Sequence, residues 1–179
     1  MAKQVLLVIA YQEYQPIEYG IPKKSLEDAG IMVVTASDKL GTALATDDHK
    51  VLVDVELSST QADRYDGIFF IGGSGALEHL DNQTSYKLIQ DAYKLNKLFG
   101  AICISPRILA HAGVLRNRKA TGWDEDNQLT AIFNKYQVTY VKEPVVVDGN
   151  IITAVGPKAA FEFGQAIIAG LKTGNYHRT

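Results

Sequence analysis

Cys103 is the only cysteine of the chain, and it stands where an apolar segment gives way to a helical one. Residues 99–102 have the character of a short strand, and Ser105 and Pro106 precede a helical stretch at residues 107–112. A nucleophile in such a strand–turn–helix elbow lies at the carboxyl edge of a sheet. The N–H groups and dipole of the following helix favour a thiolate, so we expect a pKa below the usual value of about 8.5. The spacing predicts a reactive thiol, and a buried structural cysteine is the alternative.

A second turn of the same kind is rich in glycine. Gly72, Gly73, Ser74 and Gly75 follow an apolar strand at residues 66–71 and precede a helix. Glycines there allow backbone N–H groups to approach an anionic ligand or an oxyanion. The Gly-Lys-Ser/Thr of a phosphate-binding loop is absent, and a tight structural turn is the alternative. Two such turns at the carboxyl ends of parallel strands converge on the crevice where open α/β sheets bind ligands.

The composition limits the class of protein. The chain has 179 residues, 46% of them hydrophobic and 21% charged, with a net charge of −2. The length and the hydrophobic fraction predict one packed domain and exclude disorder. The single cysteine excludes a disulfide scaffold, and the small net charge excludes a global attraction to nucleic acid. Apolar runs of six residues or fewer are too short to span a membrane. We therefore expect a cytoplasmic protein with no membrane or nucleic-acid partner.

The pattern of apolar runs predicts a single α/β domain over residues 1–172, followed by a polar tail at 173–179. The expected strands are residues 5–10, 31–36, 66–71 and 99–102, with a hairpin at 145–153. The expected helices are residues 16–29, 82 to about 98, 107–112, 126–136 and 157–171, with Asp81 or Asn82 capping the second. Residues 41–57 break this rhythm, with a hairpin tip near residues 47–50.

Taken together, these motifs resemble the ThiJ/PfpI superfamily over residues 5 to about 171. The segments that carry the likeness are Glu18 in the first helix, the glycine turn at 72–76, residues 101–121 around Cys103, and the hairpin at 145–153. The resemblance implies a flavodoxin-like three-layer sandwich with Cys103 at a nucleophile elbow. It also implies that Glu18 lies against the thiol, and that the backbone N–H groups of Gly73 and Ile104 form an oxyanion hole. A carboxyl beside a thiolate must be protonated or repel it.

One departure from the family pattern concerns the residue after the nucleophile. Protease I-like members carry histidine there, whereas this chain has Ile104. Isoleucine cannot transfer a proton, so a Cys-His-acid mechanism loses a contribution of roughly 10²- to 10⁴-fold. Glu78 is the nearest match to the acid that family members contribute across a subunit interface. Neither His79 nor His111 is placed by the sequence beside the thiol.

The remaining candidates concern the pocket and possible metal ligands. Ser74, Gly75, Trp123 and Asp124 are candidates for the pocket wall, although the last two are equally compatible with capping a loop. His49, beside two aspartates, is better explained as part of a solvated hairpin tip than as a metal ligand. No metal-ligand spacing is present, so we expect no metal and no cofactor.

Two functions are compatible with Cys103 and its surroundings. In the first, Cys103 is a covalent nucleophile toward a small carbonyl or amide compound, with glyoxalase, deglycase, amidase or peptidase chemistry. In the second, the protein is non-hydrolytic and senses oxidants through Cys103, which needs no adjacent histidine. We also expect a homodimer or higher homo-oligomer, with the helix faces bearing Tyr86, Tyr93 and Phe163 as candidate contacts and core packing as the alternative.

Overall fold

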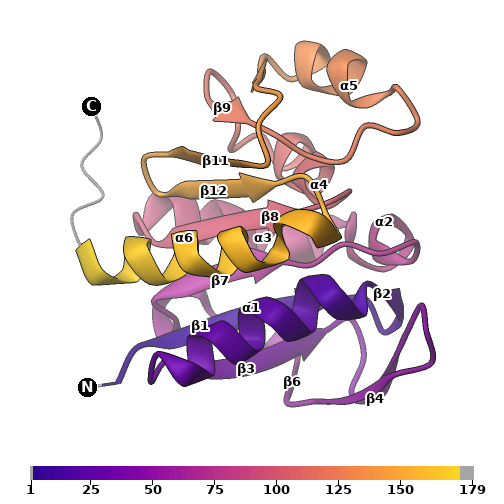
Figure 1. The fold of residues 1–179 in the computed structure, drawn as a ribbon, viewed down its shortest axis with the longest axis vertical. Coiled ribbons are helices and arrows are strands. Elements are labelled where there is room, and N and C mark those ends of the chain that lie inside the picture. Colours follow the sequence, from indigo (N-terminus) through magenta and orange to yellow (C-terminus); the bar gives the residue numbers. More distant parts are fainter. Residues whose placement is uncertain (1, 174–179) are drawn as a thin grey trace.

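A seven-stranded sheet forms the centre of the computed structural model, which describes residues 2–173 (Figure 1). The strand order is β11-β12-β8-β7-β1-β3-β6, and every neighbouring pair is parallel except β11 and β12. The bounds are β1 Gln4–Ile9, β3 Met32–Ser37, β6 Val55–Glu56, β7 Gly67–Phe70, β8 Leu98–Ile102, β11 Val145–Asp148 and β12 Ile151–Ala154. The continuous apolar runs of β1, β7 and β8 are buried because helices cover both faces of the sheet.

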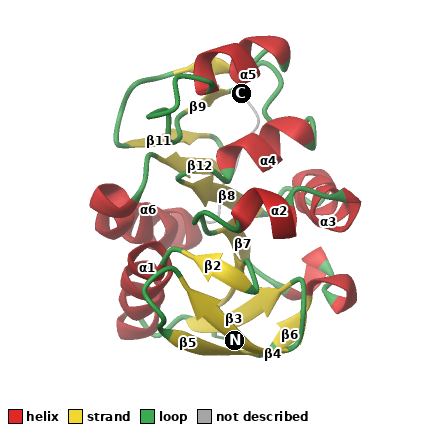
Figure 2. Cartoon of the chain, turned by 90° about the vertical axis from the view of Figure 1, so that its right-hand side faces the viewer, coloured by secondary structure: helices red, strands yellow, loops and turns green. Residues whose placement is uncertain are grey.

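Helices lie on the two sides of this sheet (Figure 2). On one side, α1 packs against α6, and Gly164 permits this contact, since a Cβ there would lie 3.2 Å from Cα of Pro22. On the other side α3 packs against α4, which in turn contacts α5. The helix bounds are α1 Pro16–Asp28, α2 Ala76–Leu80, α3 Gln83–Lys94, α4 Pro106–His111, α5 Leu129–Lys135 and α6 Ala160–Thr173. The predicted three-layer α/β sandwich with a mostly parallel sheet is confirmed.

Smaller elements complete the fold. The irregular region predicted at residues 41–57 contains the antiparallel pair β4 and β5, and β2 pairs with β4 to make a three-stranded sheet. A parallel pair, β9 and β10, follows the elbow region. The bounds are β2 Gln12–Tyr14, β4 Gly41–Ala45, β5 Lys50–Val53, β9 Lys119–Ala120 and β10 Thr139–Tyr140, with 3-10 turns η1 Leu57–Ser59, η2 Ala62–Arg64 and η3 Pro157–Ala159.

Three predicted helix boundaries are wrong. The last helix, expected from Pro157, begins at Ala160 after the 3-10 turn η3. The helix expected to run to about Leu98 ends at Lys94, because Asn96 has a φ of +53° and Leu98 already pairs with Gly67 in the sheet. The helix expected from Asp126 begins at Leu129, since the Asp126 carboxylate instead binds a side chain from α4. Asn82 is the N-cap of α3, and its side chain accepts hydrogen bonds from the backbone of the first turn.

The helix faces proposed for self-association lie largely in the core. Phe163 is fully buried against Phe69, while Tyr86 and Tyr93 are partly buried against the same core. The exposed large apolar side chains of α1 and α6 are instead Ile17, Ile21 and Phe161.

The limits of the domain differ slightly from the prediction. The last helix extends to Thr173, so this residue is helical and not part of the predicted tail. Residues 174–179 and His177 lie outside the described residues. Among residues 2–173, the structure contains no helix with the length and hydropathy that crossing a membrane requires.

Candidate functional site

Cys103 occupies a strained turn between β8 and α4. Its φ is +65°, in the left-handed region that a non-glycine residue adopts at a cost of about 1 kcal/mol or more. Two backbone hydrogen bonds hold it there: its N–H donates to the carbonyl of Ala154 at 2.9 Å, and its carbonyl accepts from Trp123 at 2.7 Å. The sheet and the following loop thus fix the direction in which the thiol points.

The first turn of α1 brings Glu18 to the thiol. The Glu18 side chain is fully buried and shares a hydrogen bond with Cys103. The backbone N–H of Gly72 donates to Oε2 of Glu18 at 3.0 Å, whereas Oε1 is buried with no hydrogen-bond partner among residues 2–173. A carboxylate would leave this oxygen unsolvated, so burial favours the protonated form.

Gly72 is the residue that makes this close approach possible. A Cβ at position 72 would lie 2.5 Å from Cβ of Cys103 and 2.6 Å from Oε2 of Glu18. Only glycine leaves room for both side chains. The sequence predicts Gly72 in the glycine-rich turn but indicates no separate role for it, because the contact joins three segments far apart in the chain.

The titration of the pair is set by burial. Burial raises the pKa of Glu18 to about 7, against smaller lowering effects from Cys103 and the N–H of Gly72. Burial, and then the facing Glu18 carboxylate, raise the pKa of the Cys103 thiol. The lower thiol pKa predicted from the helix N-terminus is therefore wrong as it stood: α4 has only six residues, and burial outweighs its effect. Since the two groups oppose each other's ionisation, the pair retains one proton near neutral pH.

Two backbone donors face the sulfur. The N–H groups of Gly73 and Ile104 both hydrogen-bond to the thiol and favour its charged form. Gly73 has a φ of +125°, and a Cβ there would lie 2.3 Å from the carbonyl oxygen of Glu13. These two N–H groups lower the pKa of the thiol, but burial and the facing carboxylate outweigh them, so the thiol pKa stays above that of Glu18 and the proton of the pair lies on sulfur. The structure brings together all four residues expected at the reacting centre.

A cavity of about 450 Å³ opens above Cys103. Its wall includes Ser74 and Trp123, as predicted, and also Thr46, Glu125 and Pro157.

The other two candidates for the pocket wall lie outside this cavity. Gly75 shapes the glycine turn, where a Cβ would lie 2.1 Å from the carbonyl oxygen of Gln12. Asp124 caps a loop, since its Oδ1 accepts from the N–H of Leu129 at 2.8 Å.

Arg107 supports the pocket wall from behind, a role that was not predicted from the sequence. Its guanidinium is buried and forms two hydrogen bonds to Asp126, at 2.7 and 3.0 Å. The same group lies 5.5 Å from the centre of the Trp123 ring and donates to the Trp123 carbonyl at 3.4 Å. A charged residue in an otherwise apolar helix was the available signal.

Among the described residues, no histidine stands beside the thiol in place of the base that Ile104 cannot supply. Nδ1 of His79 lies 2.7 Å from Asp38, Nδ1 of His111 lies 2.8 Å from Asp81, and neither ring lines the Cys103 cavity. His49 contacts Asp47 in the β4–β5 hairpin, and Glu78 is an exposed residue of α2. Within residues 2–173, no cluster of three or more His, Cys, Asp or Glu side chains is arranged to hold a metal ion.

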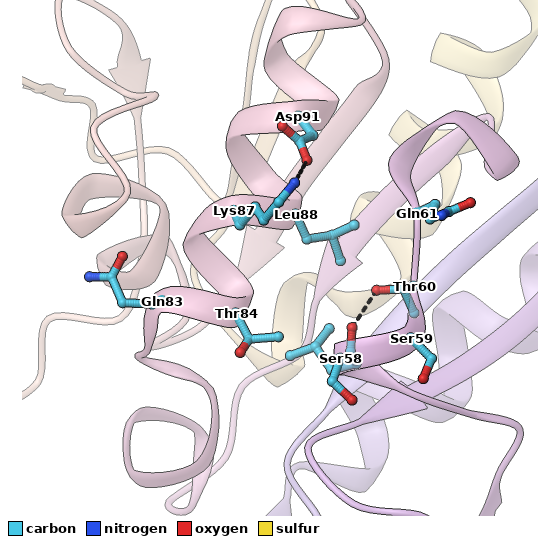
Figure 3. Close-up of a pocket in the computed structure, with 10 residues that line it drawn as sticks. Ser58, Ser59, Thr60, Gln61, Gln83, Thr84, Lys87, Leu88 and Asp91 are labelled. Atoms are coloured by element: carbon cyan, nitrogen blue, oxygen red, sulfur yellow. Dashed lines mark hydrogen bonds and ion pairs between the residues drawn. The ribbon is translucent and has the colours of Figure 1, made fainter.

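A separate hollow of about 590 Å³ lies between the η1–η2 segment and α3 (Figure 3). Ser58, Ser59 and Thr60 line one side, and Lys87 of the other side pairs with Asp91. It contains no thiol and no buried charged group. The chemistry of the protein is therefore better placed at Cys103.

The fold and the Cys103 turn together define a class: α/β sandwich proteins with a cysteine in the turn between a strand and a helix of a mostly parallel sheet. The model of the DJ-1/PfpI family matches residues 3–170, and the chain belongs to this family. The resemblance to ThiJ/PfpI proteins is thus confirmed.

Individual relatives agree with this assignment. An uncharacterised protein of Methanocaldococcus jannaschii is 33% identical, covering 96% of this chain and 84% of its own. A protein named deglycase from Pyrococcus abyssi is 26% identical, covering 93% and 99%. Among solved structures, a ThiJ/PfpI domain protein from Brachyspira murdochii has a TM-score of 0.91 at 27% identity, covering 96% and 98%. Drosophila melanogaster DJ-1beta has a TM-score of 0.85 at 26% identity, covering 97% and 95%.

Proposed function

We propose that this protein is an enzyme that uses Cys103 as a covalent nucleophile on small reactive carbonyl compounds, with α-oxoaldehydes such as methylglyoxal as the substrate class. The observation that carries the proposal is the buried contact between the Cys103 thiol and Glu18 beneath two backbone N–H donors. The deglycase name of the Pyrococcus relative is consistent with aldehyde chemistry.

The reaction begins with attack of the Cys103 sulfur on the aldehyde carbon. The C=O π bond breaks, and its electron pair moves to oxygen, which lies near the N–H groups of Gly73 and Ile104. Glu18 accepts the proton of the attacking thiol and donates it to this oxygen, which gives a hemithioacetal. Attack and protonation need only groups that already surround the sulfur.

Glu18 then acts as a base. Its carboxylate removes the hydrogen from the former aldehyde carbon and passes this proton to the ketone oxygen, which gives an enediol. The hydroxyl on the former aldehyde carbon then loses its proton to Glu18 as its C=O bond forms, and Glu18 delivers this proton to the second carbon, which completes a thioester. Water hydrolyses the thioester, so methylglyoxal plus water becomes lactate and the thiol is regenerated. A carboxyl with a pKa of about 7 suits both directions of transfer near neutral pH.

Peptide and amide hydrolysis fit this site less well. Departure of an amine needs a strong general acid near the leaving nitrogen, and the position after the nucleophile carries Ile104. Aldehyde isomerisation releases no amine and needs only one proton shuttle. The absence of a histidine therefore favours the aldehyde reaction over the protease-like reaction.

The test is conversion of methylglyoxal to lactate by the purified protein, measured before and after alkylation with iodoacetamide. The chain has a single cysteine, so the reagent removes the thiol only at position 103. We expect lactate formation that alkylation eliminates. Equal lactate formation before and after alkylation would contradict the proposed nucleophile.

We expect Glu18→Gln to separate the two tasks of this carboxyl. The amide keeps a neutral donor beside the sulfur but cannot move a proton, so lactate formation should fall by roughly 10²- to 10⁴-fold. Alkylation of Cys103 should continue at pH 8. A variant that turns over at the rate of the wild type would exclude Glu18 as the proton shuttle.

The same variant also changes the pH dependence of stability. The folded state holds the Glu18 proton between the ordinary pKa of 4.5 and the raised value of about 7. The free energy of unfolding of the wild type should therefore fall by about 3 kcal/mol as the pH rises through this window. Urea unfolding of Glu18→Gln should lack this fall.

A second candidate function is the sensing of oxidants by Cys103. A thiolate attacks the peroxide O–O bond, forming sulfenic acid and releasing hydroxide, and a protonated Glu18 can donate a hydrogen bond to the new oxygen. One structural relative, Toxoplasma gondii DJ-1, was solved in an oxidised form, with 26% identity and a TM-score of 0.81.

We also propose that the protein associates with itself, with the exposed apolar side chains Ile17, Ile21 and Phe161 as the candidate surface.

A further inference from the structure

A second cavity adjoins the one above Cys103. It has a volume of about 490 Å³ and shares three lining residues with the first: Trp123, Glu125 and Pro157. These shared residues place the two cavities side by side. Cys103 lines the first cavity, and the second, called here the distal chamber, lies beyond Trp123.

The distal chamber has an apolar and aromatic lining. Tyr140 and Val155 contribute to it, together with Gly156 and the shared Trp123 and Pro157. The Tyr140 ring is held edge-on against Phe133, with centroids 5.7 Å apart, and its hydroxyl hydrogen-bonds to Asp124. A fixed aromatic wall of this kind suits a flat apolar group.

The charged groups of the distal chamber are few. Asp124 is engaged by the N–H of Leu129 and by Tyr140, and Lys158 and Glu125 are exposed. None of the three is an unpaired buried charge that would require an ionic ligand. The chamber therefore favours a neutral substituent.

The distal chamber also touches the reacting pair. Gly156 lines it, and a Cβ on Gly156 would lie 3.8 Å from Oε1 of Glu18. The Glu18 carboxyl therefore lies directly behind the Gly156 backbone that lines the distal chamber, so the chamber and the reacting pair are immediate neighbours. A molecule as small as methylglyoxal fills only the chamber above the thiol.

We propose that the distal chamber is a specificity subsite that binds an aromatic ring attached to the reacting carbonyl carbon chain. This inference rests on the proposed function for the identity of the reacting group, and it selects aryl-substituted α-oxoaldehydes such as phenylglyoxal over methylglyoxal. Burial of a ring between Trp123, Tyr140 and Val155 should strengthen binding by at least about tenfold.

The test uses binding of the two products, mandelate and lactate, which are unreactive and carry the same hydroxyl and carboxylate groups. They differ only in the phenyl or methyl substituent, so the charge contribution cancels. Trp123 is the only tryptophan of the chain and lines both chambers, so its fluorescence reports on ligand in either. We expect the Kd of mandelate to be at least about tenfold below that of lactate.

Two variants locate the preference. Val155→Phe fills the distal chamber and should remove the preference for mandelate while lactate still binds, which also shows that the variant is folded. Val147→Phe places the same side chain on an exposed site of β11 and should leave the preference unchanged. Tyr140→Leu, which removes the aromatic wall and adds no bulk, should reduce the preference.

The outcomes separate this inference from the proposed function. Equal Kd values for mandelate and lactate in the wild type, or a preference that survives Val155→Phe, would overturn the subsite. A protein that prefers mandelate but forms no lactate from methylglyoxal would retain the subsite and lose the proposed reaction.

Discussion

Replacing Cys103 with serine is expected to reduce lactate formation from methylglyoxal by at least about 10³-fold while the protein remains folded. A serine hydroxyl ionises far above neutral pH, and the site offers no histidine to deprotonate it. The fold should tolerate the change, because serine meets the same left-handed backbone and keeps both hydrogen bonds of residue 103, to Ala154 and Trp123. Circular dichroism and urea unfolding check the fold, and lactate assays measure the loss.

A matched control separates this effect from surface substitution. Ser58→Ala removes one hydroxyl in the η1–α3 hollow, where Oγ of Ser58 donates to Glu56, and it should leave turnover unchanged. If oxidation also occurs at this thiol, peroxide treatment followed by peptide mass mapping should add oxygen at position 103 of the wild type and none at position 103 of Cys103→Ser, while the exposed Met32 can gain oxygen in both proteins. Turnover by Cys103→Ser close to that of the wild type would disprove covalent catalysis by Cys103.

The parts of this fold that the sequence predicted correctly depend on local patterns. Six-residue apolar runs predict strands buried on both faces, as in β1, and the change from apolar strand to Pro106 predicts the elbow. Glu18 was different: its charge in a first helical turn suggests solvent exposure, and only the family resemblance placed it beside the thiol. The structure buries it completely.

The parts that the sequence analysis missed depend on contacts between distant segments. The end of α3 at Lys94 was signalled only by Asn96, which adopts a positive φ just after the helix, and the pairing of Leu98 with Gly67, which also ends the helix, carries no local signal. The buried Arg107–Asp126 pair joins α4 to a loop 19 residues further along the chain. The direction of the thiol pKa was also mispredicted, because it depends on burial and on a carboxyl 85 residues away.

Gly72→Ala is the second substitution with a large expected effect, and it is expected to destabilise the fold by about 3 kcal/mol. The new methyl group would lie 2.5 Å from Cβ of Cys103 and 2.6 Å from Oε2 of Glu18. Position 72 cannot shift away freely, because its carbonyl accepts a hydrogen bond from the N–H of Gln15 at 2.9 Å. Cys103 cannot shift freely either, because its own backbone hydrogen bonds anchor it. The strain must separate the thiol from the carboxyl.

Gly20→Ala is the matched control for this substitution. Gly20 lies in the interior of α1, and a methyl group added there would have no heavy atom within 4 Å, so alanine should stabilise the helix by up to about 1 kcal/mol. The two variants make the same chemical change and should shift the urea midpoint in opposite directions. A urea midpoint of Gly72→Ala equal to that of the wild type would contradict the close packing of residues 18, 72 and 103.

Turnover of the Gly72→Ala variant then tests what the contact contributes to chemistry. If proton transfer from Glu18 requires the hydrogen bond to sulfur, the folded fraction of this variant should form lactate at least about 10²-fold more slowly than the wild type. Alkylation by iodoacetamide should be less affected, because it needs only an accessible sulfur and no proton donor. A variant that is destabilised yet turns over normally would show that the thiol acts without Glu18, and Glu18→Gln should then also retain its activity.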